Sequence, residues 1–170
     1  MAFAIDVAVL FAILALPQAA LRFTLGFSLF DLSGFSNSWG LEAFVLLTIS
    51  LPSWLYFILS DASGLGASLG KRAMGLRVVG SDAGRVGLGR AALRTLIKMI
   101  PWELTHTALL VPVPLLGTGA APSTEQAIRL GLVYVLLFGY LIVVVRSGGV
   151  RGIHDFAAGT QVVKRDADAG

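Results

Sequence analysis

Three titratable residues lie inside or beside strongly apolar stretches of the sequence. Asp6 precedes the uncharged run that begins at Val7, and Glu103 and His106 are three residues apart, which places them on one face of a helix. A carboxylate beside an imidazole in a low-dielectric environment can relay protons, because burial and nearby charges move both pKa values toward neutrality. These side chains are therefore candidates for proton or cation transport, or for charge pairing.

Simpler roles remain open for the same residues. Asp6 can reach the membrane interface from the start of its helix, and Glu103 suits a helix start, where a carboxylate complements the helix dipole. Asp155 is a fourth transport or charge-pairing candidate, but its position is typical of a residue that caps a short helix. An ion pair from Asp155 to the preceding loop is also expected, with three candidate partners: Lys71, Arg72 and Arg77.

Enzymatic, metal and cofactor chemistry find no support in the sequence. His154 stands beside Asp155 without a serine nucleophile or a carboxylate pair, so we expect no enzyme. Glu103 and His106 are too few ligands for a metal site, and the absence of cysteine excludes disulfides and thiolate metal centres. We therefore expect no catalytic residue, no metal and no cofactor.

The composition indicates a membrane protein. Of the 170 residues, 56% are hydrophobic and 14% are charged, whereas a soluble domain is roughly 45 to 50% apolar and about 25% charged. A spanning helix needs about 20 mainly apolar residues, and four windows qualify: 3–21, 42–60, 101–117 and 127–146. The third is the weakest, because Glu103, His106, Pro112 and Pro114 interrupt it.

Basic residues predict the orientation of these spans, since short cytoplasmic loops are enriched in Lys and Arg. Seven of the 13 basic residues lie in the loop 61–100, and four follow from Arg146 onward. We therefore expect a single domain, 1–170, in the cell membrane, with four helices in two hairpins. The loop 61–100, the tail 147–170 and both termini are then cytoplasmic.

Two short segments of the predicted cytoplasmic face are β-prone. Gly75–Val79 and Gly159–Val163 each combine a glycine, a long polar residue and a β-branched pair. A lone strand leaves its backbone groups unpaired, so we expect the two strands to pair near Val78 and Val162. They form a small cap that ties the hairpins together, with four polar members: Lys71, Arg72, Arg77 and His154.

A basic stripe precedes the third span. Arg90, Arg94 and Lys98 recur every four residues beside an apolar face. This pattern is typical of an amphipathic helix in the headgroup plane, where the stripe contacts anionic lipid, or of the solvated face of a helix docked on protein.

The fold class is thus all-α with a two-stranded β patch. The expected partner is an anionic bilayer and not nucleic acid, because Lys and Arg exceed Asp and Glu by only three; a small cation and a second copy of the chain remain open.

Several blocks of the sequence together point to a known family. They are Ile5-Asp6, GKRAMGLRVV (70–79), LGRAALR (88–94) and GIHDFAAGTQVV (152–163). In their order and spacing the chain resembles the RDD family, which is named for one arginine and two aspartates. Asp6 matches the first aspartate and Asp155 is the candidate for the second, whereas the printed sequence has no counterpart of the arginine.

The resemblance implies a multi-pass membrane protein, and some family members are linked to cation/proton exchange. We therefore expect cation or proton-coupled transport. The alternative is a non-transporting scaffold or interaction module with a basic cytoplasmic cap.

Overall fold

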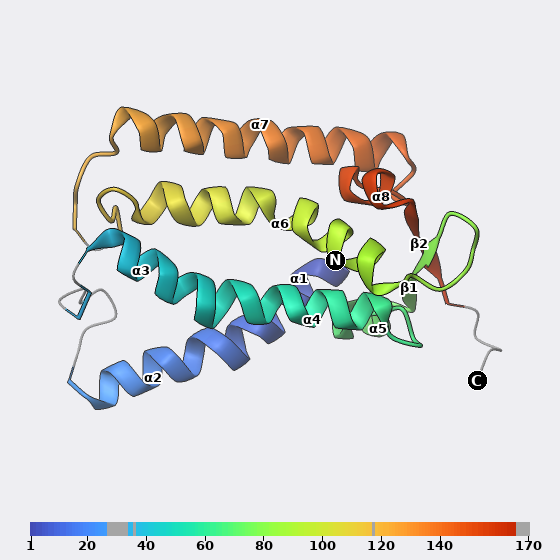
Figure 1. The fold of residues 1–170 in the computed structure, drawn as a ribbon, viewed down its shortest axis with the longest axis horizontal. Helices are drawn as coiled ribbons and strands as arrows, with labels where there is room; N and C mark the ends of the chain where they lie inside the picture. Colours follow the sequence, from blue (N-terminus) through green and yellow to red (C-terminus); the bar gives the residue numbers. More distant parts are fainter. Residues whose placement is uncertain (27–33, 36, 117, 166–170) are drawn as a thin grey trace. The chain divides into compact units, whose positions relative to one another are not determined.

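The computed structural model describes residues 1–26, 34–35, 37–116 and 118–165 (Figure 1). The last residue of the predicted third span, 117, and the end of the predicted tail, 166–170, lie outside the described residues. The chain is mostly helical and forms two compact units. The first unit comprises residues 1–9, 53–99 and 138–170, and the second unit comprises residues 10–52 and 100–137.

In the part of the chain that the structure describes, three helical stretches are long and apolar enough to cross a membrane: Ala2–Thr24, Ser38–Ala62 and Thr124–Arg146. The first consists of α1 (Ala2–Leu10), a π-helical turn η1 (Phe11–Ala15) and α2 (Leu16–Thr24). The second consists of α3 (Ser38–Val45), a π-helical turn η2 (Leu46–Ser50) and α4 (Leu51–Ala62). The third is the single helix α7 (Thr124–Arg146).

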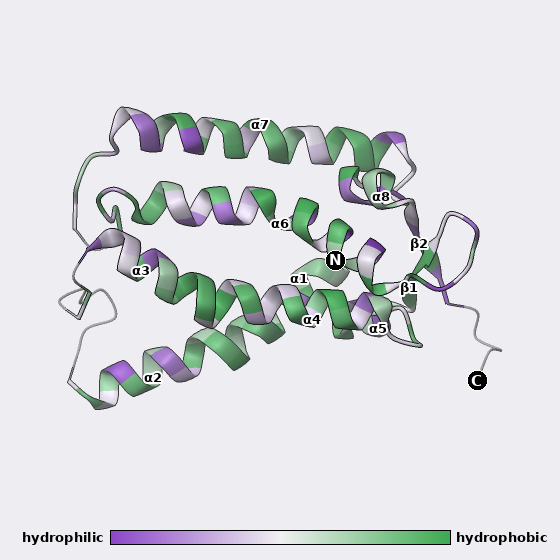
Figure 2. Cartoon of the chain, viewed as in Figure 1, coloured by the Kyte–Doolittle hydropathy of each residue, from purple (hydrophilic) through white to green (hydrophobic). Residues whose placement is uncertain are grey.

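Helix α7 is apolar around most of its circumference, as Figure 2 shows. Its side chains Tyr134, Val135 and Phe138 are each more than 60% exposed. A helix that is hydrophobic all round is stable only in apolar surroundings. The surface of α7 is therefore suited to contact with lipid, as the sequence predicted for residues 127–146.

Helix α6 (Leu88–Leu110) runs without a break through Pro101. The sequence predicted a headgroup helix that ends before Pro101 and a separate span that begins there, and this division is wrong. Proline lacks an N–H and leaves the carbonyl four residues earlier without its helical donor. The Tyr140 hydroxyl donates to that carbonyl, on Ile97, at 2.5 Å, so the helix continues. Helix α6 is not among the three candidate spans.

The remaining elements are short. They are α5 (Leu69–Ala73), β1 (Leu76–Gly80), α8 (Ile153–Ala158) and β2 (Thr160–Lys164). Strands β1 and β2 pair antiparallel, with Val78 opposite Val162, which confirms the predicted pairing and register. Gly159, with φ of 62°, ends α8 in the left-handed conformation that favours glycine and leads directly into β2.

A small apolar core lies under the β1 side of this sheet, in the first unit. Val78, Val86 and Ala91 are buried there, and Ile58 and Ala62 of α4 pack against them. The core joins the end of a candidate span to the strand and to the start of α6. These elements provide the side chains of the polar network described next.

Candidate functional site

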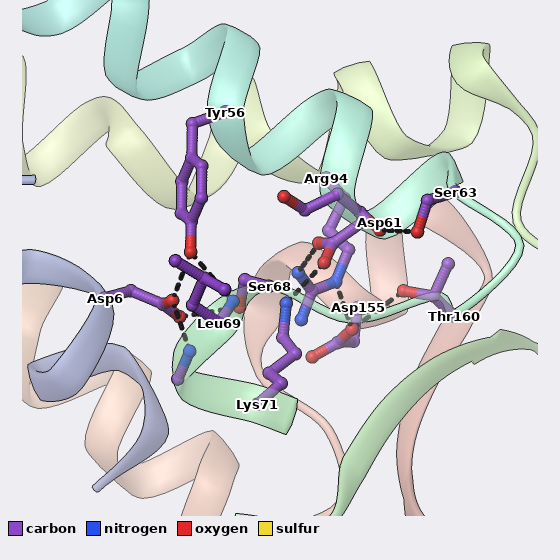
Figure 3. A network of polar contacts seen from close by, with 12 residues as sticks. Asp6, Tyr56, Asp61, Ser63, Ser68, Leu69, Lys71, Arg94, Asp155 and Thr160 are labelled. Carbon is purple, nitrogen blue, oxygen red and sulfur yellow. Dashed lines mark hydrogen bonds and ion pairs between the residues drawn. The ribbon is translucent and has the colours of Figure 1, made fainter. Parts of the chain in front are cut away.

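Arg94 of α6 lies at the centre of a buried ion network in the first unit (Figure 3). Its Nη1 lies 2.6 Å from Asp61 Oδ2, and its Nε lies 2.8 Å from Asp155 Oδ1. Lys71 completes the group, with its Nζ 2.5 Å from Asp61 Oδ1. The Arg94 side chain is 3% exposed. Two cations and two carboxylates thus neutralise one another away from water.

Asp155 connects three elements through its two carboxylate oxygens. Its Oδ2 accepts a hydrogen bond from the Gly152 N–H at 3.0 Å, at the start of α8. Its Oδ1 accepts from the Thr160 hydroxyl of β2 at 2.7 Å, in addition to Arg94 of α6. The predicted capping role is therefore confirmed. The predicted ion pair to Lys71, Arg72 or Arg77 is wrong, because Arg94 takes that place.

The protonation states of this network follow from burial and charge. Burial raises the pKa of the Asp155 carboxyl, but hydrogen bonding from His154 and the charge of Arg94 outweigh it and hold that pKa well below its usual range. Burial lowers the pKa of His154, in spite of its contact with Asp155. The neutral imidazole can donate from Nε2, which lies 3.1 Å from Asp155 Oδ2. Burial also lowers the pKa of Lys71, against the attraction of Asp61.

Asp6 of α1 is 1% exposed and lies in a separate set of hydrogen bonds. It accepts from the Tyr56 hydroxyl at 2.7 Å, the Ser68 hydroxyl at 2.6 Å and the Gly70 N–H at 2.7 Å. Gly70 is required there, because a Cβ would collide with the Ala2 carbonyl oxygen and with the Asp6 carboxylate. Three uncharged donors therefore satisfy Asp6. Among the described residues no cation forms an ion pair with it.

The second unit contains a different arrangement of carboxylates, on α3 and α6. Glu42 is 8% exposed, and its Oε2 has no hydrogen-bond partner in the described part of the chain. Glu103 lies near enough to influence Glu42 electrostatically, as does Arg129. Glu103 accepts a hydrogen bond from the Ser50 hydroxyl at 3.1 Å, and its Oε2 lies 3.9 Å from His106 Nδ1. The predicted neighbourhood of Glu103 and His106 is confirmed.

Arg129 of α7 is largely occupied by hydrogen bonds at the end of α6. Its Nη1 donates to the carbonyls of Thr107 and Val111 at 3.0 and 3.2 Å, and its Nη2 pairs with Glu125. The last carbonyls of a helix have no partner within the helix, so Arg129 stabilises that end. Its charge lies near Glu42, but its hydrogen bonds are used elsewhere.

The sequence interpretation missed Glu42. This residue is the first of the predicted span 42–60. Only the folded chain brings it to Glu103, 61 positions later. The sequence did contain a signal for Glu42. It is a carboxylate at the start of a predicted span, the same feature that singled out Asp6.

A comparison with family models decides the classification. The model of the RDD family matches residues 1–159. The chain belongs to the RDD family. RDD proteins are membrane proteins, in keeping with the three candidate spans. No curated protein and no solved structure gives a significant match.

Asp6, which matches the first aspartate of the RDD pattern, and Asp155, the candidate for the second, are both buried and held by several donors. Asp6 joins α1 to α4 and α5, whereas Asp155 joins α8 to β2 and α6. Their geometry suits them to holding elements together.

The basic stripe of this RDD protein faces several environments. Arg90 is exposed, so its predicted contact with lipid headgroups stays a prediction. The same prediction for Arg94 is wrong, because its guanidinium is enclosed by Asp61 and Asp155. Lys98 also turns into the first unit, with its Nζ 3.3 Å from the centre of the Phe57 ring, a cation–π contact.

Of the four predicted cap residues, Lys71 and His154 belong to the Arg94 network. Arg72 is exposed, and Arg77 is half-buried on β1. Among the described residues no group of three or more His, Cys, Asp or Glu side chains is placed to hold a metal ion.

Proposed function

We propose that this RDD protein is a multi-pass protein of the cell membrane that couples proton movement to a small cation, and that Glu42 and Glu103 form the titrating site. One observation carries the proposal: a buried Glu42 oxygen has no hydrogen-bond partner in the described part of the chain, and Glu103 is near enough to act on it electrostatically. Intramembrane ionisable residues commonly mark ion or proton pathways. The proposal involves no enzymatic activity and no cofactor.

The physical argument rests on like charges in a low-dielectric environment. Repulsion between two neighbouring carboxylates there favours uptake of one proton, which the two groups can share. A cation bound between them compensates the charge in the same way. Arg129 compensates part of the charge, but its hydrogen bonds go to backbone carbonyls and to Glu125. His106, beside Glu103, supplies a group that can take up and release protons.

The proposed topology has four spans, with α6 as the third in chain order. At about 1.5 Å per residue, the 23 residues of α6 are long enough for the roughly 30 Å hydrocarbon layer. The basic residues before α6, Lys71, Arg72, Arg77 and Arg85, and those of the tail support a cytoplasmic position for both segments. The loop before α6 and the tail after α7 lie on one side of the membrane only if the chain crosses an even number of times between them, so α6 and α7 both have to cross.

Flux through proteoliposomes tests the proposal. The purified chain is reconstituted with a trapped pH-sensitive dye, and gradients of Na⁺, Li⁺ or K⁺ are imposed in turn. We expect one of these cations to drive proton movement, and Glu42→Gln or Glu103→Gln to lower the initial rate at least about tenfold. Glu125→Gln is the matched control, because Glu125 is the third glutamate in the sequence and its side chain is 64% exposed.

The alternative is a non-transporting scaffold, which the closed Arg94 network favours. That network joins α4, α5, α6 and α8 through ion pairs and hydrogen bonds. If folded, reconstituted protein moves no protons with any of the three cations, the transport proposal fails and the scaffold takes its place.

A further inference from the structure

A cavity of about 60 Å³ lies in the first unit, between the turn that follows α4 and strand β1. It is lined by residues 63–66, 77–79 and 83–86. One buried water needs about 10 to 15 Å³ of such volume, so the cavity has room for a group of several heavy atoms. Gly64, Leu65 and Arg85 of its lining are exposed, and the cavity therefore opens to the surface.

Arg77 gives this cavity an unsatisfied positive group. Its Nε is buried and has no hydrogen-bond partner within the described residues, and none of the ion pairs found there includes Arg77. A buried N–H without an acceptor costs about 1 to 3 kcal/mol. An anion that supplied the acceptor would remove this cost.

Arg85 contributes a second guanidinium to the same cavity. Its Nη2 lies 3.9 Å from the position that a Cβ would take on Gly64, so the side chain reaches the turn after α4. Asp82, in the turn that carries part of the lining, has an Oδ1 that accepts a hydrogen bond from the Gly84 N–H at 3.1 Å. Two arginines and one aspartate leave an excess of positive charge.

The walls of the cavity are fixed by backbone contacts. The Val78 N–H donates to the Gly66 carbonyl at 2.7 Å, and Gly66 has φ of 59°. A Cβ on Gly66 would lie 2.7 Å from the Val78 carbonyl oxygen, so the turn lies directly against β1. The pairing of Arg77 with Val163 holds the strand on its other edge. The arginines are thus presented by a formed site.

We infer that this cavity binds a phosphate group. Guanidinium groups match phosphate oxygens in geometry and form charge-assisted hydrogen bonds with them. The turn begins directly after Ala62, the last residue of a candidate span, so phospholipid headgroups are within reach by chain connectivity. Inorganic phosphate offers the same chemistry from solution. This inference does not depend on transport.

Calorimetric titration of the full chain in uncharged detergent tests the inference. Three probes are titrated separately: inorganic phosphate, dioctanoyl phosphatidic acid, and dioctanoylglycerol, which has the same tails without the phosphate. We expect one or both phosphate probes to bind and dioctanoylglycerol not to bind. Loss of one charged hydrogen bond corresponds to roughly tenfold weaker binding or more, and this is the expected effect of Arg77→Gln.

The matched control is Arg72→Gln, because Arg72 is exposed and does not line the cavity. Arg85→Gln, at an exposed position, is a second test that stands even if Arg77→Gln does not fold. Binding of inorganic phosphate alone indicates a soluble ligand, and binding of phosphatidic acid alone indicates a headgroup. The inference is overturned if neither phosphate probe binds, or if the cavity variants bind as tightly as Arg72→Gln.

Discussion

The two units of this RDD protein bury their carboxylates in opposite ways. In the first unit, Asp6 has three uncharged donors, and Asp155 has a cation, a hydroxyl and a backbone N–H. In the second unit, one Glu42 oxygen has no hydrogen-bond partner among the described residues, and Glu103 influences it electrostatically. A buried charge is tolerated when it is fully paired. We therefore propose that the fully hydrogen-bonded carboxylates hold the structure together, whereas Glu42 takes up a proton or a cation.

The strongest way to break this comparison is to remove the central cation of the first unit. Arg94→Gln leaves Asp61 and Asp155 without their shared guanidinium in a buried site. Removal of one partner from a buried ion pair costs about 3 to 5 kcal/mol, so we expect a loss of this size in the free energy of unfolding. Chemical unfolding in mixed micelles measures it.

Two further variants sharpen the Arg94 prediction. Arg90→Gln lies one turn away at an exposed position and should change stability by no more than about 0.5 kcal/mol. Adding Asp155→Asn to Arg94→Gln should restore part of the loss, because the carboxylate that loses its guanidinium partner is then removed as well. Equal stability of Arg94→Gln and Arg90→Gln would mean that the network does not hold the first unit together.

A smaller effect is expected at Asp6. Asp6→Asn replaces one accepting oxygen by an amide NH₂ group, which cannot accept from Tyr56, Ser68 or Gly70. Hydrogen bonds to charged groups contribute about 1.5 to 3 kcal/mol, and we expect a destabilisation in that range by chemical unfolding. Asp82→Asn, in an exposed turn, is the control. A destabilisation no larger than that of Asp82→Asn would show that the donors around Asp6 contribute little.

The smallest effect is expected for Asp155, whose protonation should make the free energy of unfolding fall at acid pH. Its folded-state pKa is held below the usual range, so the unfolded chain takes up the proton first. The stabilisation is present above the unfolded pKa near 3.9 and is lost as pH falls below it, by about 1 kcal/mol at pH 3. We expect Asp155→Asn to flatten the decline in stability between pH 5 and pH 3. If the free energy of unfolding of Asp155→Asn falls as steeply with pH as that of the wild-type chain, Asp155 does not have the lowered pKa.

Several features of the fold followed from the sequence because local chemistry determines them. The β1 and β2 segments each join a glycine to a β-branched pair, and an unpaired strand is unstable, so their pairing at Val78 and Val162 was predictable. The capping role of Asp155 was predictable for the same reason, since a short helix needs an acceptor at its first turn. Three of the four predicted spans coincide with described helices that are long and apolar enough to cross a membrane.

Other features depend on tertiary contacts that no local pattern contains. The four-residue period of Arg90, Arg94 and Lys98 predicts a helix but cannot say whether protein or lipid covers each side chain. Helix α6 continues through Pro101 because Tyr140, 39 positions later, donates to the Ile97 carbonyl. The approach of Glu42 to Glu103 likewise comes from helix packing. These contacts link positions far apart in the sequence. Glu103 and His106 of the candidate site were therefore predicted, whereas Glu42 was not.

Proton flux per folded molecule is the most direct test of the contrast between the two units. Proteoliposomes with Glu42→Gln and with Asp6→Asn are compared with the wild-type chain, and each initial rate is divided by the amount of folded protein. The account predicts that Glu42→Gln loses most of the flux while its stability is kept, and that Asp6→Asn keeps the flux per folded molecule. The reverse result, with flux lost in Asp6→Asn and kept in Glu42→Gln, would contradict it.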